Sequence, residues 1–314
     1  MSGSRGIRSA LIVGAGAIGA ALASRLYDSD PDSVFICASG ERKARYERDG
    51  FSVNGASYSF RIAEPARAPF DLVIFAVKDY DLETAIHEAS AYIGPDTSVL
   101  SLLNGLESET RLRAAFGAGN VPLGFIIRID AMRIGTSVTF ADIGEIRFGW
   151  EKNDPKRLEP RVMAIADFLS AHGMPYSVPE DMVRALWFKF MINVAVNQWS
   201  ALLRGDYGFF QRSPSARLLL RKTMEEVLEL SRALGTGLGE ADIEQVFLTL
   251  GSLPPGGKTS MLQDVEAGRK TEVEAFSGAV IRLAAAAGLR APMNETLYSA
   301  LRAIEESAAR PNGS

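Results

Sequence analysis

The chain has 314 residues, about twice the length of a typical domain, so two domains are expected. Its composition, 47% hydrophobic and 23% charged, is that of a folded globular protein and excludes disorder over the whole length. The net charge of −4 gives no general attraction to nucleic acids or anionic membranes, and we predict neither as a partner. One cysteine and two histidines argue against a disulfide or a zinc site, so we predict a cytoplasmic protein without a metal.

An apolar run from Ala10 to Ala23 follows basic residues near the N-terminus, a pattern that resembles a secretory signal peptide. The run is too short to span a bilayer, and the spacing of its glycines indicates another purpose. The signal peptide therefore remains an alternative interpretation of this segment.

Short apolar runs alternate with helical segments through the first half of the chain, which predicts a parallel sheet with right-handed crossovers. Asn54-Gly55 lies between two of the short runs and predicts a β-hairpin. The predicted strands are Ser9–Val13, Val34–Cys37, Phe51–Val53, Tyr58–Ile62, Leu72–Val77 and Ser98–Leu103. The predicted helices are a segment that ends near Tyr27, Glu41–Arg48, Asp81–Ala91 and a segment that begins at Ser108.

After a strand at Val121–Ile127 the pattern changes. Ser137–Phe140 and Glu145–Phe148 predict two antiparallel strands, and Pro175–Val178 predicts a further strand. Helical periodicity dominates the rest, with helices predicted at Pro160–Ala171, Asp181–Leu203, Pro214–Leu234, Glu240–Leu250, Thr271–Ala287 and Met293–Glu306. This change of pattern predicts one domain over residues 1–178 and a second over residues 179–314.

A glycine-rich motif follows the first predicted strand and opens the first predicted helix. Its residues are Gly14-Ala15-Gly16-Ala17-Ile18-Gly19. In this context GxGxxG is the dinucleotide-binding fingerprint: the glycines allow a tight turn, close approach of the pyrophosphate and close helix packing. A glycine turn without a ligand is the alternative. The predicted fold class is an α/β N-terminal Rossmann-type dinucleotide-binding domain plus a mainly α-helical C-terminal domain.

The end of the second predicted strand normally distinguishes NAD from NADP. Ser39 can donate a hydrogen bond to a 2′-phosphate, and Arg42 and Lys43 lie close by in the sequence, which favours NADP (NADPH) as the cofactor. Glu41 is acidic and so favours NAD instead, and Arg42 and Lys43 could equally form a solvated helix face.

Lys78 and Asn104 each follow a predicted parallel strand, at the carboxyl end where open α/β sheets bind ligands. Lys78 could instead be a surface cation, and Asn104-Gly105 an ordinary turn.

Lys189 stands in one of the most apolar stretches of the chain, within the predicted helix Asp181–Leu203. Burial of an ammonium group there without a partner would be unfavourable by several kcal/mol. Asn193 and Asn197 follow at intervals of four residues, so the three side chains form one stripe along the helix. The stripe suits a polar ligand in a largely apolar site, whereas a snorkelling lysine with two exposed amides is the alternative.

These motifs together resemble the ketopantoate reductase family, the 2-dehydropantoate 2-reductases, over nearly the whole chain. The resemblance rests on the glycine motif, Lys78, Leu103-Asn104-Gly105, Leu186-Trp187-x-Lys189-x-x-x-Asn193-x-x-x-Asn197, Tyr207-Gly208, Ser260-Met261-Leu262-Gln263-Asp264 and Arg269-Lys270-Thr271-Glu272-Val273-Glu274. Three positions depart from the family: Ser39 stands where an arginine often binds the 2′-phosphate, Gln198 where a proline is common, and Arg128–Arg133 is an unusual segment.

The resemblance implies the roles of the individual residues. Lys189 would be the general acid, and Glu272 would lie beside Lys189 or the cofactor ribose. Asn193, Asn197 and Ser260 would hold the substrate, while Lys78 and Asn104 would contact the cofactor, with Asn104 also near the substrate. The implied activity is reduction of 2-dehydropantoate, or a closely related 2-keto acid, by NADPH in pantothenate biosynthesis.

Two other functions stay open. A β-hydroxyacid dehydrogenase also uses a helix lysine with an asparagine four residues later, and a catalytically silent nucleotide-sensing protein could keep the glycine motif alone. The apolar helices of the second domain fit a homodimer interface and core packing equally well.

Overall fold

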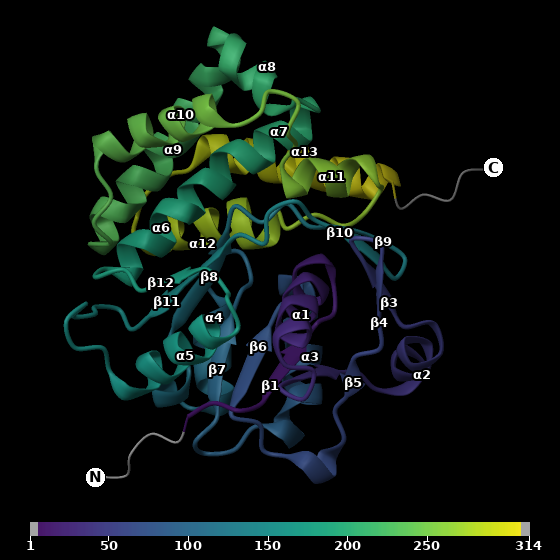
Figure 1. The fold of residues 1–314 in the computed structure, drawn as a ribbon. Coiled ribbons are helices and arrows are strands. Elements are labelled where there is room, and N and C mark those ends of the chain that lie inside the picture. The colour runs from purple at the N-terminus through teal and green to yellow at the C-terminus, as the bar shows by residue number, and fades with distance from the viewer. Residues whose placement is uncertain (1–5, 309–314) are drawn as a thin grey trace. The chain divides into compact units, whose positions relative to one another are not determined.

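The computed structural model describes residues 6–308 and divides the chain into two compact units, Met1–Met182 and Val183–Ser314. Figure 1 shows a sheet flanked by helices in the N-terminal unit, and helices in the C-terminal unit. The predicted fold class, α/β followed by mainly α, is confirmed.

The main sheet of the N-terminal unit has five parallel strands in the order β5-β2-β1-β6-β7. Ile12 of β1 lies between Ile36 of β2 and Ile74 of β6, and all three side chains are buried. Burial on both faces explains the uninterrupted apolar runs in the sequence. The strands are β1 (Ala10–Val13), β2 (Val34–Cys37), β5 (Arg61–Ile62), β6 (Leu72–Phe75) and β7 (Ser98–Ser101).

Helices cover both faces of this sheet. Ile12 packs in one apolar core with Leu22, and Leu11 packs in the other with Leu82, so alternate residues of β1 serve opposite faces. The helices are α1 (Ala17–Ser29) and α5 (Pro160–Ala171) on the Ile12 face, α3 (Leu82–Ala89) and α4 (Ser108–Phe116) on the Leu11 face, and α2 (Gly40–Asp49), which follows β2.

Two small sheets complete the unit, and here the strand predictions need correction. The predicted strand Tyr58–Ile62 is split: β4 (Ala56–Tyr58) forms the expected hairpin with β3 (Phe51–Val53), whereas β5 joins the main sheet. The predicted pairing of Ser137–Phe140 with Glu145–Phe148 is wrong.

The first of those segments, β10 (Ser137–Thr139), pairs instead with β3 and with β9 (Met132–Ile134), a strand that the sequence did not predict. The second, β11 (Glu145–Gly149), pairs with β8 (Leu123–Ile127) and β12 (Tyr176–Ser177). β3 and β10, like β8 and β11, are distant in the chain and leave no local turn signal. β9 and β10 are joined by the two-residue turn Gly135-Thr136, a hairpin signal that the predictions did not use.

The C-terminal unit consists of helices, and wider π-helical turns interrupt one of the long predicted helices and begin another. We name these the first π-turn (Asn193–Asn197) and the second π-turn (Glu274–Gly278). The helices are α6 (Met182–Ile192), α7 (Gln198–Leu203), α8 (Tyr207–Arg212), α9 (Pro214–Leu234), α10 (Glu240–Ser252), α11 (Ser260–Glu266), α12 (Ala279–Ala286) and α13 (Pro292–Ala308). Short α8 and α11 were not predicted. None of the described helices is long and apolar enough to cross a membrane.

Candidate functional site

The glycine motif forms the turn between β1 and α1. Gly14 has a φ of +100°, a conformation that side chains rarely adopt. A Cβ atom on Gly14 would lie 2.5 Å from Cγ1 of Val77 and 2.9 Å from the carbonyl of Ala76, so the turn lies tightly against the end of β6. Both the conformation and the lack of space require glycine at this position.

The other two glycines of the motif differ in their surroundings. A Cβ atom on Gly19 would lie only 2.0 Å from the carbonyl oxygen of Gly14, because α1 packs directly on the turn. A Cβ atom on Gly16 would meet nothing closer than 3.9 Å. Gly16 is also the N-cap of α1, and no side chain caps that helix. An open turn at an uncapped helix N-terminus fits the pyrophosphate of a dinucleotide.

A cation that sequence reasoning missed lies at this turn. Arg133 of β9 donates from Nη1 to the carbonyl oxygen of Ala15 and from Nε to that of Gly135, the latter at 2.6 Å. The structure thus places a guanidinium beside the glycine turn, in the segment that departs from the family pattern. No local signal predicts this contact, because residues 15 and 133 are brought together only by the fold.

The end of β2 carries a network that the sequence did not reveal. Ser39 Oγ donates to Glu88 Oε1 at 3.1 Å, and Arg42 Nη2 donates to Oε2 of the same carboxylate. The neighbouring Lys43 forms an ion pair with Glu64. The three groups predicted to favour a 2′-phosphate are therefore all held by carboxylates of the N-terminal unit.

Lys78 and Asn104 stand where the sequence placed them along the chain. Lys78 directly precedes the short 3₁₀ turn Asp79–Asp81 after β6, and Asn104 lies in the loop between β7 and α4. Both side chains are half-buried. Since β6 and β7 are parallel neighbours, these residues follow adjacent strands at the same edge of the sheet.

A buried acid ties the first turn of α4, a few residues after Asn104, to β8. The carboxylate of Glu109 is 3% exposed, accepts from Ser108 Oγ at 2.8 Å and accepts from the backbone N–H of Gly124 at 3.2 Å. Burial raises the pKa of Glu109 above its usual value. The sequence predicted only a helix that begins at Ser108, so this link between α4 and β8 was missed.

Lys189, Asn193 and Asn197 follow one another along α6 and the first π-turn. Lys189 is half-buried, and Asn193 is only 7% exposed. Asn197 Nδ2 donates to Asn193 Oδ1 at 3.2 Å, so the two amides are joined. The prediction of a regular α-helix was wrong here, because the asparagines begin and end the π-turn. Such turns are frequent at functional sites.

Asn193 has an unsatisfied donor. Within the part of the chain that the structure describes, Asn193 Nδ2 is buried and has no hydrogen-bond acceptor. A buried amide without a partner is unfavourable by about 1–3 kcal/mol and is uncommon in folded proteins. An acceptor oxygen of a bound ligand would satisfy this group.

Ser260 lies on helix α11, which packs beside the first π-turn. Ser260 is exposed and begins α11, while the preceding Thr259 caps the helix by accepting from Leu262 N at 3.1 Å. Helix α11 packs against α7 and the first π-turn. The Tyr207-Gly208 motif anchors the loop before α11, because Gly208 N donates to the carbonyl of Pro255 at 2.7 Å.

Glu272 belongs to the same unit and is 4% exposed. It lies just before the second π-turn, which packs against the first. The preceding Thr271 donates from its N–H and its hydroxyl to Glu305 Oε1, at 2.7 and 2.6 Å, which fixes the backbone there.

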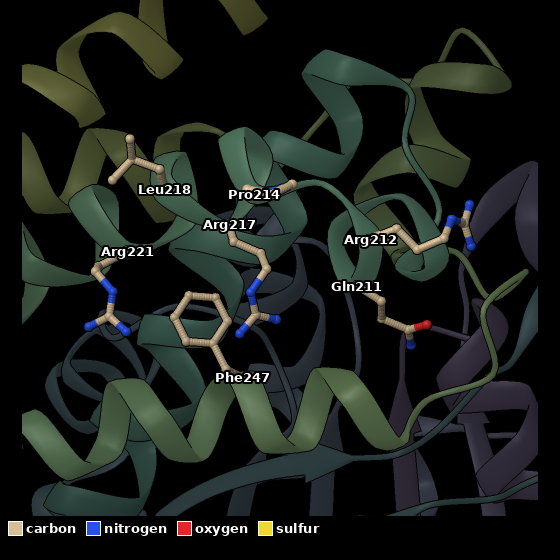
Figure 2. Close-up of a pocket in the computed structure, with 7 residues that line it drawn as sticks. All are labelled: Gln211, Arg212, Pro214, Arg217, Leu218, Arg221 and Phe247. Carbon is tan, nitrogen blue, oxygen red and sulfur yellow. The ribbon is translucent and has the colours of Figure 1, made fainter.

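A surface hollow of about 390 Å³ opens elsewhere in this unit (Figure 2). Arg217 and Arg221 lie over the ring of Phe247, at 4.2 and 5.2 Å from its centre, and Arg221 also pairs with Glu244. The hollow is lined by Gln211, Arg212, Pro214, Arg217, Leu218, Arg221 and Phe247, none of which is a predicted site residue. Among residues 6–308, no group of three or more His, Cys, Asp or Glu side chains could hold a metal ion.

Two descriptions of one protein family match this chain. "Ketopantoate reductase PanE/ApbA" matches residues 10–152, and "Ketopantoate reductase PanE/ApbA C terminal" matches residues 181–305. The 2-dehydropantoate 2-reductase of Halobacterium salinarum is 26% identical, over 93% of this chain and 97% of that protein.

Solved structures show the same fold. A D-mandelate dehydrogenase with NADH and anilino(oxo)acetate aligns with a TM-score of 0.85 and 22% identity, over 96% of this chain and all of that one (100%). A dimeric ketopantoate reductase from Staphylococcus aureus aligns with a TM-score of 0.78 and 21% identity, over the same shares, 96% and 100%.

A dinucleotide-binding unit followed by a helical unit with a lysine and two asparagines on one helix defines an NAD(P)-dependent oxidoreductase of two units. The chain belongs to the ketopantoate reductase PanE/ApbA family.

Proposed function

We propose that this protein reduces 2-dehydropantoate, or a closely related 2-keto acid, to the corresponding 2-hydroxy acid with NADPH, as a cytoplasmic enzyme of pantothenate biosynthesis. Two family descriptions and a relative with this activity support the proposal. The single buried cysteine, Cys37, agrees with a reducing compartment.

The cofactor would be held by the N-terminal unit. Its proposed contacts are Gly14, Ala15, Gly16, Ala17, Ile18, Gly19, Ser39, Arg42, Lys78 and Asn104, with Glu272 from the C-terminal unit. When bound, NADPH supplies the hydride for the ketone carbon. The open side of Gly16 and the uncapped start of α1 are the features that suit its pyrophosphate.

The C-terminal unit would bind the substrate and supply the proton. Lys189 as an ammonium stabilises the negative charge on the ketone oxygen and donates a proton to it. Asn193 and Asn197 fix oxygen atoms of the substrate, Ser260 binds its carboxylate, and Glu272 lies beside Lys189 or the cofactor ribose. The unsatisfied donor of Asn193, four residues from Lys189, is the observation that carries this assignment.

Replacement of the lysine is the direct test. In Lys189→Ala we expect turnover of NADPH with 2-dehydropantoate to fall about 10²- to 10⁴-fold, since general acid catalysis contributes that much. The dissociation constant of NADPH should change little. Lys222→Ala removes an exposed lysine of the same unit and is the matched control. Near-normal turnover of Lys189→Ala would refute the proposal.

A substrate panel separates the proposal from its rivals. Turnover is measured with 2-dehydropantoate, several branched 2-keto acids and 2-hydroxy acids, each with NADPH and NADH. A preference for other acids would indicate a different dehydrogenase of this family. Cofactor binding without turnover of any acid would indicate a nucleotide-sensing protein.

We also propose that the protein forms a homodimer. The support is the dimeric state named for the Staphylococcus aureus enzyme, which has the same fold. Light scattering coupled to gel filtration gives the mass directly, and a mass of one chain at working concentration would contradict this proposal.

A further inference from the structure

One carboxylate binds two of the three groups that were predicted to favour a 2′-phosphate. Glu88, near the end of α3, accepts from Ser39 Oγ with Oε1 at 3.1 Å and from Arg42 with Oε2. The ion pair is only partly shielded, with 23% of the Glu88 side chain and 40% of the Arg42 side chain exposed. Since α3 follows β6 rather than β2, the usual inspection of the β2 end does not detect this acid.

Ser39 is diverted from the ordinary role of its position. It is the N-cap of α2, where a serine hydroxyl normally accepts from a backbone N–H of the first turn. No such bond forms here, and the hydroxyl is engaged with Glu88 instead. The hydroxyl of Ser39 and the guanidinium of Arg42 therefore both bind the carboxylate of Glu88.

Arg42 retains a donor that Glu88 does not use. Its Nε atom is buried and has no acceptor among the described residues. The negative charge of Glu88 also reaches Cys37 at the end of β2. Burial, with a further contribution from Glu88, raises the pKa of that thiol to about 11, and Arg42 opposes the shift. The end of β2 thus holds the anion Glu88 together with the cation Arg42, whose Nε could still donate a hydrogen bond.

NADH and NADPH differ only in the group on the 2′ carbon of the adenosine ribose, which normally binds at the end of β2. A ribose 2′-hydroxyl can donate a hydrogen bond to a carboxylate, as acidic residues do in NAD-binding proteins. A 2′-phosphate has no such proton to offer at neutral pH, and it competes with the carboxylate for the arginine. Glu88 therefore opposes the phosphate and is compatible with the hydroxyl.

We propose that Glu88 sets the cofactor selectivity of this protein by holding Ser39 and Arg42 away from a 2′-phosphate, so that NADH competes effectively with NADPH. The inference rests on the proposed function, because it assumes that the ribose of a nicotinamide dinucleotide binds at the end of β2. Glu88 acts through Ser39 and Arg42 and is a specificity residue rather than a catalytic one.

The test compares dissociation constants of NADPH and NADH for the full-length protein without substrate, measured by calorimetry. Glu88→Gln keeps a hydrogen-bonding side chain and removes the charge. We expect NADPH to bind more tightly and the preference for NADPH over NADH to rise about tenfold, the effect of one charged hydrogen bond. Glu88→Ala is the second variant and should shift the ratio in the same direction.

Glu83→Gln is the matched control, because Glu83 lies on the same helix and pairs with Arg111 instead. It removes the same charge from α3 and should leave the ratio unchanged. Arg42→Ala combined with Glu88→Gln should abolish the gain for NADPH. An unchanged ratio in Glu88→Gln, or an equal change in Glu83→Gln, would overturn the inference alone. Failure of the unmodified protein to bind either cofactor would overturn the proposed function as well.

Discussion

The glycine turn, proposed to bind the cofactor, and the π-turn cluster, by which we mean Lys189 with the first and second π-turns, proposed to bind the substrate, use different parts of the chain. At the glycine turn the useful groups are backbone amides, and the side chains matter mainly by being absent. In the π-turn cluster the useful groups are the side chains of a lysine and two asparagines, held on a helix whose backbone is widened. The glycine turn thus depends on the room left beside its backbone, and the π-turn cluster depends on its polar side chains.

This difference predicts opposite responses to substitution. Adding a methyl group should damage the glycine turn according to the space available at each glycine. Removing a side chain should damage the π-turn cluster according to whether that side chain already has partners within the protein. Three sets of variants test the comparison.

The largest effect is expected at Gly19. In Gly19→Ala the new Cβ atom would lie 2.0 Å from the oxygen of Gly14, so α1 and the turn must separate. We expect the affinity for NADPH to fall about 100-fold or more, with a lower free energy of unfolding. Calorimetric titration and urea unfolding measure the two quantities.

Gly16→Ala is the matched control for that variant. Its Cβ atom would meet nothing within 3.9 Å, so the free energy of unfolding should stay within about 0.5 kcal/mol of the original. The affinity for NADPH should still fall about tenfold, because the methyl group lies where the pyrophosphate approaches the backbone. Equal losses of stability in Gly16→Ala and Gly19→Ala would break the argument from space.

A smaller but more selective effect is expected at Asn193. Its Nδ2 atom has no acceptor within the described residues, so Asn193→Ala removes an unfavourable buried donor together with the bond from Asn197. We expect kcat/KM for the keto acid to fall about 10- to 100-fold, while the free energy of unfolding changes by less than about 1 kcal/mol. Steady-state kinetics and urea unfolding provide the two measurements.

Asn294→Ala serves as the contrast to that variant. Asn294 is fully buried, and its amide donates to Glu226 at 2.8 Å while its oxygen is 3.0 Å from Ser277 Oγ. This variant should lose about 1–3 kcal/mol of stability and retain its kinetics if it folds. A large stability loss in Asn193→Ala with unchanged kcat/KM would show that Asn193 is structural.

The same two regions show what the sequence could and could not predict. The glycine turn was predictable because Gly14, Gly16 and Gly19 respond to a local steric requirement that leaves a fixed spacing. The stripe of Lys189, Asn193 and Asn197 was found from helical periodicity, but the π-turn was not. A one-residue widening of a helix leaves the apolar pattern almost unchanged over so short a segment.

Contacts between distant segments were beyond the sequence. Glu88 lies in an amphipathic helix where an acid suggests only a solvated face, and its contact with Ser39 spans 49 residues. Arg133 reaches the glycine turn from a strand that local propensity failed to identify. The sequence therefore predicted the backbone framework of the proposed cofactor site and the cations Arg42 and Lys78, but missed Glu88 and Arg133, which only the fold brings to it.

A smaller effect on kcat/KM than at Asn193 is expected at Gln198, which follows the first π-turn. Gln198 is fully buried, donates to the carbonyl of Val194 at 2.7 Å and accepts from Ser277 Oγ of the second π-turn at 2.8 Å. Because Ser277 Oγ also lies 3.0 Å from Asn294, the side chain of Gln198 joins a network between the two π-turns.

Removal of that side chain tests whether the π-turn cluster depends on its internal partners as well as on its ligand. We expect Gln198→Ala to lose about 1–3 kcal/mol in urea unfolding, with kcat/KM reduced only a few-fold. Gln211→Ala removes two part-buried bonds to the carbonyls of Leu250 and Leu253, and it should lose less because the Gln211 side chain is itself only half-buried. In the double variant with Asn294→Ala the losses should be less than additive, since both residues share Ser277. Strict additivity would mean that the two π-turns are stabilised independently.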